Sequence, residues 1–318
     1  MTRVLVTGCG GFIGRAVCHE LRRRKIEFNG TTRIRTLEMD FPVYQITDIN
    51  QQTDWRKSLS EVDVVLHLAG RAHVLNDKAT DPLSEFRRVN VAGTINLAQQ
   101  ALESGARRFI FMSSIGVNGN ITCTSPFNEL SPPTPHADYA VSKLEAEHEL
   151  RKLFEKIPAQ LVIIRPPLVY GPEVPGNFRR LLNFVARELP LPLGAIHNQR
   201  SMIAVENLVD FLITCIQHPR AGGEMFLVAD GTDISTPRLI RLLGEGMGKT
   251  PLLLPVPKVL LKFCAWIARR SSLYQQLCCS LQVDATKAHT ILNWTPTVGM
   301  EDALRETAEW FKGILNDG

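Results

Sequence analysis

The chain has 318 residues, more than one hydrophobic core usually serves, so we expect a large domain with a smaller lobe. Its hydrophobic content of 44% is ordinary for a globular protein, and the net charge of +4, carried by dispersed Lys and Arg residues, does not favour a nucleic-acid-binding protein. The seven cysteines form no CxxC pair and no metal-like spacing with histidine, and their odd number argues against a disulfide framework, so we expect reduced cytoplasmic thiols and no metal site.

The first predicted element is a strand, Val4-Leu5-Val6, which begins so early that we expect no signal peptide. A turn with three glycines follows, and then residues 15–24 are expected to form a helix. Gly8 permits the tight turn, Gly11 lets the backbone approach a pyrophosphate at the helix N-terminus, and Gly14 lets helix and strand pack closely. The same glycine spacing also occurs in ordinary loops, so it is the flanking strand and helix that indicate a dinucleotide-binding unit.

Short apolar strands alternate with helical stretches through the first half of the chain. Apart from His67, residues 64–68 and 109–112 are apolar, as expected for strands of a parallel sheet that is buried on both faces. From about residue 171 the pattern changes to Pro-rich loops and helices. We therefore predict an α/β fold with a Rossmann-type doubly wound parallel sheet in residues 1–170, joined by later strands from about residues 200–230, and a smaller, largely helical substrate lobe in residues 171–318.

Tyr139 and Lys143 are four residues apart in a predicted helix, so their side chains project from one face. A phenol has a reference pKa of about 10, and a nearby cation stabilises the phenolate, so Tyr139 is predicted to act as an acid or base near neutrality. Alone, such a pair is more often an amphipathic surface pair. Its presence in the same chain as the glycine turn favours a redox enzyme.

The order of these motifs resembles the extended short-chain dehydrogenase/reductase family, in its nucleotide-sugar epimerase, dehydratase and reductase branch. The resemblance covers nearly the whole chain. It implies that the cofactor contacts come from the glycine turn, from the ends of the following strands, where Asp48 and Ile49 meet the adenine ring, and from the loop after residue 165 that closes over the nicotinamide. The implied cofactor-binding residues are Gly8, Gly11, Phe12, Ile13, Gly14, Arg33, Asp48, Ile49, Leu68, Ala69, Gly70, Asn90, Tyr139, Lys143 and Pro166.

The resemblance also implies a catalytic hydroxyl at the end of the strand over residues 109–112. We assign this role to Ser114, although Ser113 and Ser114 are also suited to satisfying backbone groups there. The implied catalytic residues are thus Ser114, Tyr139 and Lys143. The dehydratase branch needs an acid and base directly after the hydroxyl, where this chain has Ile115 and Gly116, so we exclude dehydratase chemistry.

By the same resemblance Asn177 and Arg200 contact the phosphates of a nucleoside-diphosphate sugar, while Ser114 contacts its sugar. Arg suits this task because its planar guanidinium can bond two phosphate oxygens at once. The alternative for Arg200 is a surface salt bridge. His67, within a predicted strand, is expected to be a hydrogen-bonded core histidine, or otherwise to contribute only backbone to the cofactor wall.

The choice of cofactor depends on the end of the second strand, where a carboxylate is typical of NAD sites and a guanidinium pairs with the 2′-phosphate of NADP. Arg33 occupies that place, which favours NADP; the alternatives are that Arg33 or Arg35 points into solvent and that NAD is tightly bound. NADP favours a 4-ketoreductase of a UDP-4-keto sugar, such as a 6-deoxy-N-acetylhexosamine. A UDP-hexose 4-epimerase is the alternative, and a non-catalytic nucleotide-sensing Rossmann protein is a remote one.

One apolar segment, residues 259–268, is followed by two arginines. It is too short to span a bilayer, which takes about 20 residues, so we expect no transmembrane segment. We expect a helix buried in the C-terminal lobe; an interfacial or oligomer-contact helix is the alternative. A homodimer is possible for this family, and a UDP-sugar is the expected small-molecule partner.

Overall fold

A seven-stranded parallel sheet forms the centre of the larger domain, with the strand order β3-β2-β1-β4-β5-β6-β9. The computed structural model describes residues 2–34, 40–72 and 80–316. The seven strands are β1 (Val4–Thr7), β2 (Phe28–Thr32), β3 (Val43–Gln45), β4 (Val64–His67), β5 (Arg108–Met112), β6 (Gln160–Arg165) and β9 (Met225–Leu227). The predicted Rossmann-type doubly wound sheet is confirmed.

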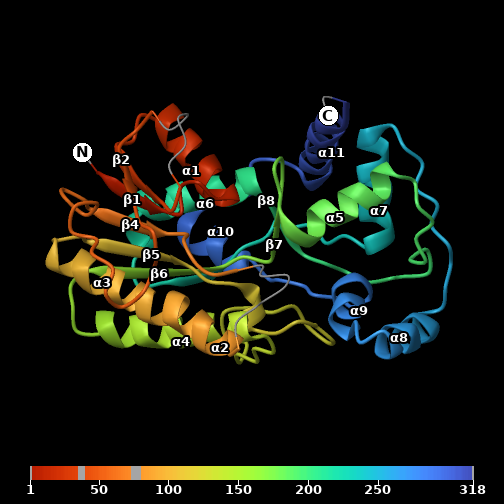
Figure 1. Ribbon diagram of the computed structural model, residues 1–318, viewed down its shortest axis with the longest axis horizontal. Coiled ribbons are helices and arrows are strands. Elements are labelled where there is room, and N and C mark those ends of the chain that lie inside the picture. The colour runs from red at the N-terminus through yellow and green to blue at the C-terminus, as the bar shows by residue number, and fades with distance from the viewer. Residues whose placement is uncertain (1, 35–39, 73–79, 317–318) are drawn as a thin grey trace.

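Helices cover both faces of this sheet, which explains why its central strands β1, β4, β5 and β6 are mostly apolar. In β1, Val4 and Val6 pack into one core with helices α1 (Phe12–Arg23) and α6 (Val205–Gln217), whereas Leu5 packs into another with α3 (Gly93–Glu103) and α4 (Asp138–Phe154). Figure 1 shows α1 and α6 on one side of the sheet and α3 and α4 on the other. Helix α1 begins three residues earlier than predicted, so that Gly14 lies inside its first turn.

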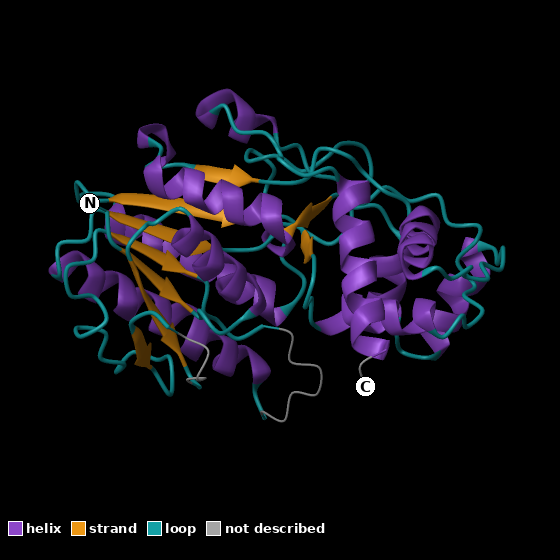
Figure 2. Ribbon diagram, turned by 90° about the horizontal axis from the view of Figure 1, so that it is seen from above, coloured by secondary structure: helices purple, strands orange, loops and turns teal. Residues whose placement is uncertain are grey.

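A helical lobe with its own hydrophobic core adjoins the sheet domain (Figure 2). Buried side chains of this core include Tyr170, Leu243 and Phe311. Its helices are α5 (Gly176–Ala186), α7 (Thr236–Met247), α8 (Lys258–Ile267), α9 (Ser271–Cys278) and α11 (Met300–Asn316). A two-stranded parallel sheet, β7 (Leu168–Tyr170) with β8 (Met202–Ala204), lies where the chain passes between the two parts.

The chain returns to the sheet domain twice after residue 171. Helix α6 and strand β9 return first, and α10 (Thr286–Leu292) returns later, with Ala288 and Leu292 buried in the same core as β1. Figure 1 accordingly shows α10 beside the sheet and not in the helical lobe. Among the residues described, no helix has the length and apolar character needed to cross a membrane.

The strand order reverses between β1 and β4, whose carboxyl ends therefore border a crevice in which ligands of open α/β sheets bind. The segments that follow β1, β4, β5 and β6 all leave the sheet at this edge, because the four strands are parallel. The predicted site residues in these segments are thereby brought to one place.

Candidate active site

The glycine turn joins β1 to α1 in a conformation that requires glycine. Gly8 has φ +71°, in the left-handed region that favours glycine, and its carbonyl oxygen accepts a hydrogen bond from Gly11 N at 2.9 Å. A Cβ atom at position 14 would lie 2.1 Å from that same oxygen. No side chain caps the start of α1, so the turn leaves N–H groups at the helix N-terminus available to an anion. Phe12 and Ile13 follow in the first turn of α1, both partly buried.

The backbone after β4 is fixed by a threonine that the sequence motifs did not single out. Thr7 Oγ1 accepts hydrogen bonds from the N–H groups of Leu68 and Ala69, both at 3.1 Å, and lies 2.8 Å from His67 Nδ1. Because the hydroxyl oxygen accepts twice, its proton is donated to Nδ1. The ring then carries its proton on Nε2, which is 3.0 Å from Thr94 Oγ1.

His67 is therefore a neutral, hydrogen-bonded core histidine, as predicted. Burial and the nearby Lys143 charge lower its pKa to about 3. The hydrogen bonds of Thr7 to the backbone of Leu68 and Ala69 hold the chain after β4 against the glycine turn. The approach is close, because a Cβ atom on Gly8 would lie 3.1 Å from Ala69 Cα.

Asn90 and Lys143 meet next to Gly70. Asn90 lies in a single π-helical turn, residues 88–92, and its amide bonds the backbone of Arg71 and the hydroxyl of Ser142. A Cβ atom at Gly70 would lie 3.1 Å from Asn90 Oδ1 and 3.5 Å from Lys143 Nζ. The close contact is thus with Asn90, whereas the distance to Lys143 is an ordinary van der Waals contact.

Lys143 is buried, and its ammonium donates to the carbonyl of Met112 at 2.8 Å. The ammonium also lies 4.5 Å from the ring centroid of Phe111 and 5.8 Å from that of Tyr139. Burial lowers the pKa of Lys143 to about 8, against the opposing field of the Glu147 carboxylate one turn further along α4. The two predicted catalytic residues therefore share one face of α4, as their spacing required.

The phenol of Tyr139 differs from its prediction. Burial raises its pKa to about 12, and the Lys143 charge does not offset this. In the protein alone the group is thus protonated at neutral pH, whereas the spacing to Lys143 predicted a pKa lowered toward neutrality. The cause is desolvation of the phenolate; the Lys143 ammonium donates its hydrogen bond to the Met112 carbonyl and lies 5.8 Å from the Tyr139 ring centroid.

The two serines at the end of β5 have different environments. Ser113 is 2% exposed, and its hydroxyl donates to Glu147, which in turn forms a buried ion pair with Arg165. Arg165 also donates to Asn118 Oδ1 at 3.0 Å, which completes a buried network beneath the site. Ser113 is thus committed to the interior, and Ser114 is the serine that remains half-buried at the site.

Ser114 lies at the start of a short 3-10 turn, residues 115–117. Its Oγ accepts from Gly116 N at 3.1 Å, and this turn is held to β6 by a hydrogen bond from Ile115 N to the carbonyl of buried Pro166 at 2.9 Å. A Cβ atom on Gly116 would lie 3.4 Å from both Ser114 Oγ and Ala140 Cβ. This close approach places Ser114 beside the first turn of α4, which carries Tyr139.

The residues predicted to contact the adenosine half of the cofactor have different environments. Arg33 directly follows β2 and is exposed, and the guanidinium has no ion pair among the described residues. Arg35 lies outside the described residues. Asp48 is paired with Arg88 at 2.6 Å, which with Asn50 holds the pKa of the carboxyl below its usual range. Ile49 packs against Gly93, where a Cβ atom would lie 2.5 Å from Ile49 Cγ2.

The predicted phosphate ligands lie in the helical lobe, and both contact the region of α9. Asn177 donates to Gln276 at 3.1 Å, and the Arg200 guanidinium donates to the carbonyl of Cys279 at 3.1 Å. Burial lowers the pKa of Arg200, and no carboxylate pairs with it in the ranges that the structure describes. The salt-bridge alternative for Arg200 is therefore not observed, and its guanidinium has capacity for an anion.

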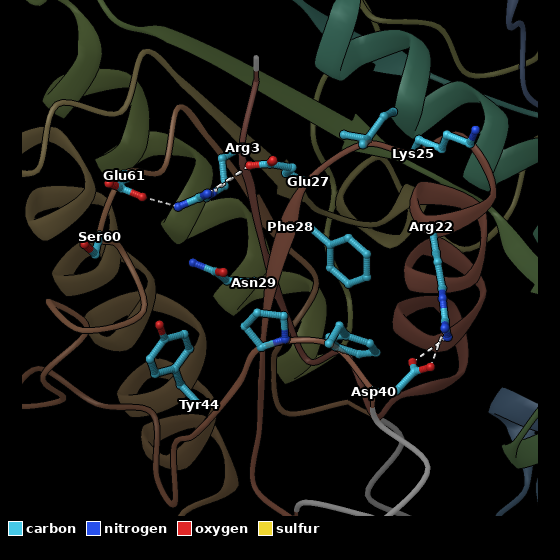
Figure 3. Close-up of a pocket in the computed structure, with 13 residues that line it drawn as sticks. Arg3, Arg22, Lys25, Glu27, Phe28, Asn29, Asp40, Tyr44, Ser60 and Glu61 are labelled. Carbon is cyan, nitrogen blue, oxygen red and sulfur yellow. Dashed lines mark hydrogen bonds and ion pairs between the residues drawn. The ribbon is translucent and has the colours of Figure 1, made fainter.

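A large hollow of about 600 Å³ lies elsewhere, at the opposite edge of the sheet. Figure 3 shows Arg3 between Glu27 and Glu61, and Arg22 paired with Asp40, around the amino-terminal ends of β1 and β2. None of the predicted site residues lines this hollow. The site is therefore defined by the carboxyl-end segments and not by this cavity.

Comparison with known proteins decides the family. Residues 4–229 match the model of the "NAD dependent epimerase/dehydratase family". The chain belongs to that family. It is 40% identical over 311 residues, 97% of this chain and 95% of the relative, to the UDP-glucose 4-epimerase of Vibrio cholerae. The comparisons thus confirm two predictions: the family, and that the protein is an NAD(P)-dependent enzyme.

Solved structures of other proteins share the fold over nearly the whole chain. UDP-glucuronic acid 4-epimerase from Bacillus cereus, in complex with UDP-glucuronic acid and NAD, has a TM-score of 0.78 at 24% identity, covering 98% of this chain and 100% of that one. RMD from Pseudomonas aeruginosa, complexed with NADPH, has a TM-score of 0.74 at 20% identity, covering 99% and 100%. The neighbours thus include both NAD and NADPH binders.

The glycine turn fits the NAD(P) pyrophosphate of this family, because the cradle has no room for side chains at Gly8 and Gly14. We expect Gly14→Ala to cost about 1–3 kcal/mol through overpacking against the Gly8 carbonyl, seen as weaker binding of NADPH or NADH and a lower Tm. Fluorescence titration and thermal unfolding measure this. Gly313→Ala is the matched control on another helix, since its Cβ meets nothing within 4 Å. Unchanged dinucleotide affinity and Tm in Gly14→Ala would contradict this role of the turn.

Proposed function

We propose that the protein is an NADPH-dependent 4-ketoreductase of a UDP-4-keto-hexose, such as a 6-deoxy-N-acetylhexosamine. The observation that carries this proposal is Arg33, an exposed guanidinium at the carboxyl end of β2 with no ion pair among the described residues. A guanidinium in this place suits a 2′-phosphate and provides no acceptor for the ribose hydroxyls of NAD.

The protonation state of Tyr139 also supports reduction. When bound, the nicotinamide supplies the hydride that reaches C4 of the sugar. Tyr139, whose pKa is raised to about 12, holds the proton that the C4 oxygen needs as the carbonyl becomes an alcohol. Ser114 donates a hydrogen bond to the same oxygen, and the charged Lys143 stabilises the phenolate that remains.

The lobe residues would hold the nucleoside diphosphate. Arg200 is the stronger candidate, because a partly buried guanidinium without a carboxylate partner in the described structure gains most from a phosphate. Asn177, exposed at the start of α5, would add an amide donor. The UDP-sugar in the Bacillus cereus neighbour supports this class of substrate.

Dehydratase chemistry is not part of the proposal. The two positions after Ser114 are Ile115, which is buried, and Gly116, whose N–H already bonds the Ser114 hydroxyl. Neither side chain can transfer a proton to or from neighbouring sugar carbons.

A UDP-hexose 4-epimerase is the second candidate, favoured by the name of the Vibrio cholerae relative. Such an enzyme would use the same Ser114, Tyr139 and Lys143 in both directions, so the catalytic residues do not distinguish the two. The difference lies in the cofactor, because an epimerase regenerates its NAD in each turnover whereas a reductase consumes NADPH.

The pH dependence of ketone reduction follows from the two shifted groups. Reduction requires protonated Tyr139 and charged Lys143, whose pKa values are about 12 and about 8. We expect kcat/KM to be flat at lower pH and to fall by about tenfold per pH unit above pH 8, where Lys143 loses its charge. Oxidation of the alcohol should instead gain from deprotonation of Tyr139. A reduction profile that stays flat well above pH 8 would remove Lys143 from this role.

Titration of the purified protein with NADPH and NADH, after mass spectrometry of any nucleotide it retains, tests the cofactor part. We expect an empty site that binds NADPH at least roughly tenfold more tightly than NADH, and loss of this preference in Arg33→Ser. Arg56→Ser, which removes another exposed arginine, is the control. Tightly retained NAD with no response to NADPH would overturn the reductase in favour of the epimerase.

A further inference from the structure

Helix α8 has an apolar surface that the rest of the described protein does not cover. None of its ten residues is buried, contrary to the prediction of a helix packed inside the lobe. Figures 1 and 2 show the lobe at the end of the molecule away from the sheet, with α8 and α9 side by side at its edge in Figure 1. The most exposed apolar side chains of α8, with their exposed fractions, are Val259 (80%), Trp266 (69%), Ile267 (62%), Phe263 (56%) and Leu260 (51%).

Helical periodicity gathers these side chains on one face. Val259, Phe263 and Trp266 follow one another at the spacings that place residues on a common stripe, and the Phe263 and Trp266 ring centroids are 6.2 Å apart. Ile267 and Leu260 extend the same stripe. Only Leu261, on the opposite side of the helix, is part of the packing around the lobe core. The exposed Leu252 and Leu254 precede this helix in the chain.

The charged residues of α8 and of the turn that follows it are all positive. Residues 258–270 contain no Asp or Glu, and their cations are exposed and form no ion pair with a described residue. Lys258 and Lys262 are one helical turn apart and border the apolar stripe, while Arg269 and Arg270 lie at its C-terminal end. Elsewhere on the surface, by contrast, basic side chains commonly pair with carboxylates, as Arg87 does with Glu145.

We propose that α8 is a docking surface for an anionic lipid bilayer, on which the helix lies in the plane of the interface. Aliphatic and aromatic side chains bordered by lysine and arginine are what such a helix needs, because the apolar face enters the headgroup boundary while the cations meet lipid phosphates. With ten residues, about 15 Å, the helix is too short to span the bilayer. Trp266 and Phe263 are side chains suited to that boundary.

A second copy of this chain fits the same surface less well. In a two-fold symmetric contact the same face meets itself, which would place the cations of one α8 beside those of the other with no carboxylate from this segment to neutralise them. An anionic bilayer matches the apolar and the charged parts of the surface together.

Docking in this way would place the candidate phosphate site close to the membrane. Helix α9 follows α8 directly and packs beside it, and Gln276 of α9 accepts the hydrogen bond of Asn177. Arg200 bonds the carbonyl of Cys279 at the end of α9. The lipid-binding proposal does not rest on the proposed function, because it is measured without substrate.

Vesicle flotation of the full-length protein tests the proposal. We expect the protein to float with phosphatidylcholine vesicles that contain phosphatidylglycerol, far less with phosphatidylcholine alone, and to be released by salt. The emission of Trp266, the most exposed tryptophan, should shift to the blue on binding. Lys258→Glu/Lys262→Glu should weaken binding roughly tenfold or more, and Phe263→Ser/Trp266→Ser should abolish it.

The controls make the same chemical changes on other surfaces. Lys57→Glu/Lys156→Glu reverses two exposed charges in the sheet domain, and Leu130→Ser removes a leucine that is 92% exposed. Both controls should float like the wild type, and all variants should keep its Tm within a few degrees because none of these side chains is buried. Absence of flotation, flotation unaffected by the α8 variants, or a dimer in solution that Phe263→Ser/Trp266→Ser dissociates would overturn the proposal.

Discussion

Tyr139→Phe is expected to lower kcat for carbonyl reduction by roughly 10²- to 10⁴-fold, because it removes only the proton that the C4 oxygen receives. The ring remains against Phe86, with the two centroids 6.1 Å apart, so the first turn of α4 should keep its packing. Affinity for the dinucleotide should change by no more than a few fold. Steady-state kinetics together with dinucleotide titration measures both quantities.

The neighbouring serines provide a matched control for this prediction. Ser114→Ala should lower kcat, because its hydroxyl is at the site, whereas Ser113→Ala should leave kcat nearly unchanged and lower stability, because its hydroxyl bonds buried Glu147. Equal losses of kcat in the two variants would show that Ser114 has been misassigned. Full turnover in Tyr139→Phe would remove the phenol from the mechanism.

Glu147→Gln is expected to destabilise the protein by about 3–5 kcal/mol, because it leaves the Arg165 guanidinium buried without its counter-ion. The two side chains are 1% and 5% exposed, and the pair bonds Ser113 and Asn118 as well. Urea unfolding measures the free energy. In the wild type the Glu147 charge raises the pKa of Lys143 and so opposes the effect of burial. Loss of this charge in the variant should lower the pKa of Lys143 further and move the fall in kcat/KM to lower pH.

Glu149→Gln is the control on the same helix. Glu149 pairs with Lys152 at 2.7 Å, but the two side chains are 46% and 70% exposed. Loss of this surface pair should change the free energy of unfolding by less than about 1 kcal/mol. If Glu147→Gln were as mild as Glu149→Gln, the buried network would not be what holds β5, β6 and α4 together beneath the site.

The elements around the cofactor were predictable because they depend on local chemistry. Strands buried on both faces are mostly apolar, as residues 64–66 of β4 are, and a glycine at position 8 is favoured by its φ of +71°. The helical spacing of Tyr139 and Lys143 likewise places both on one face wherever the helix lies. These features do not depend on how the rest of the chain is arranged.

Features that depend on long-range contact were not predictable from the sequence. Thr7, His67 and Thr94 form one hydrogen-bonded series only because β1, β4 and α3 are neighbours in space. Burial raises the pKa of the Tyr139 phenol, and the four-residue spacing to Lys143 gave no indication of that burial. In the same way, the apolar composition of α8 did not reveal whether its side chains pack against the rest of the chain or face outward, as they do in the structure.

The measurement that tests the central claim most directly is turnover of a UDP-4-keto-6-deoxy-N-acetylhexosamine with NADPH, followed by loss of NADPH absorbance and by NMR of the sugar. The account predicts consumption of one NADPH for each 4-hydroxy sugar formed, with little turnover in Tyr139→Phe. Interconversion of UDP-hexoses at C4 without consumption of NADPH would contradict it and make the protein an epimerase.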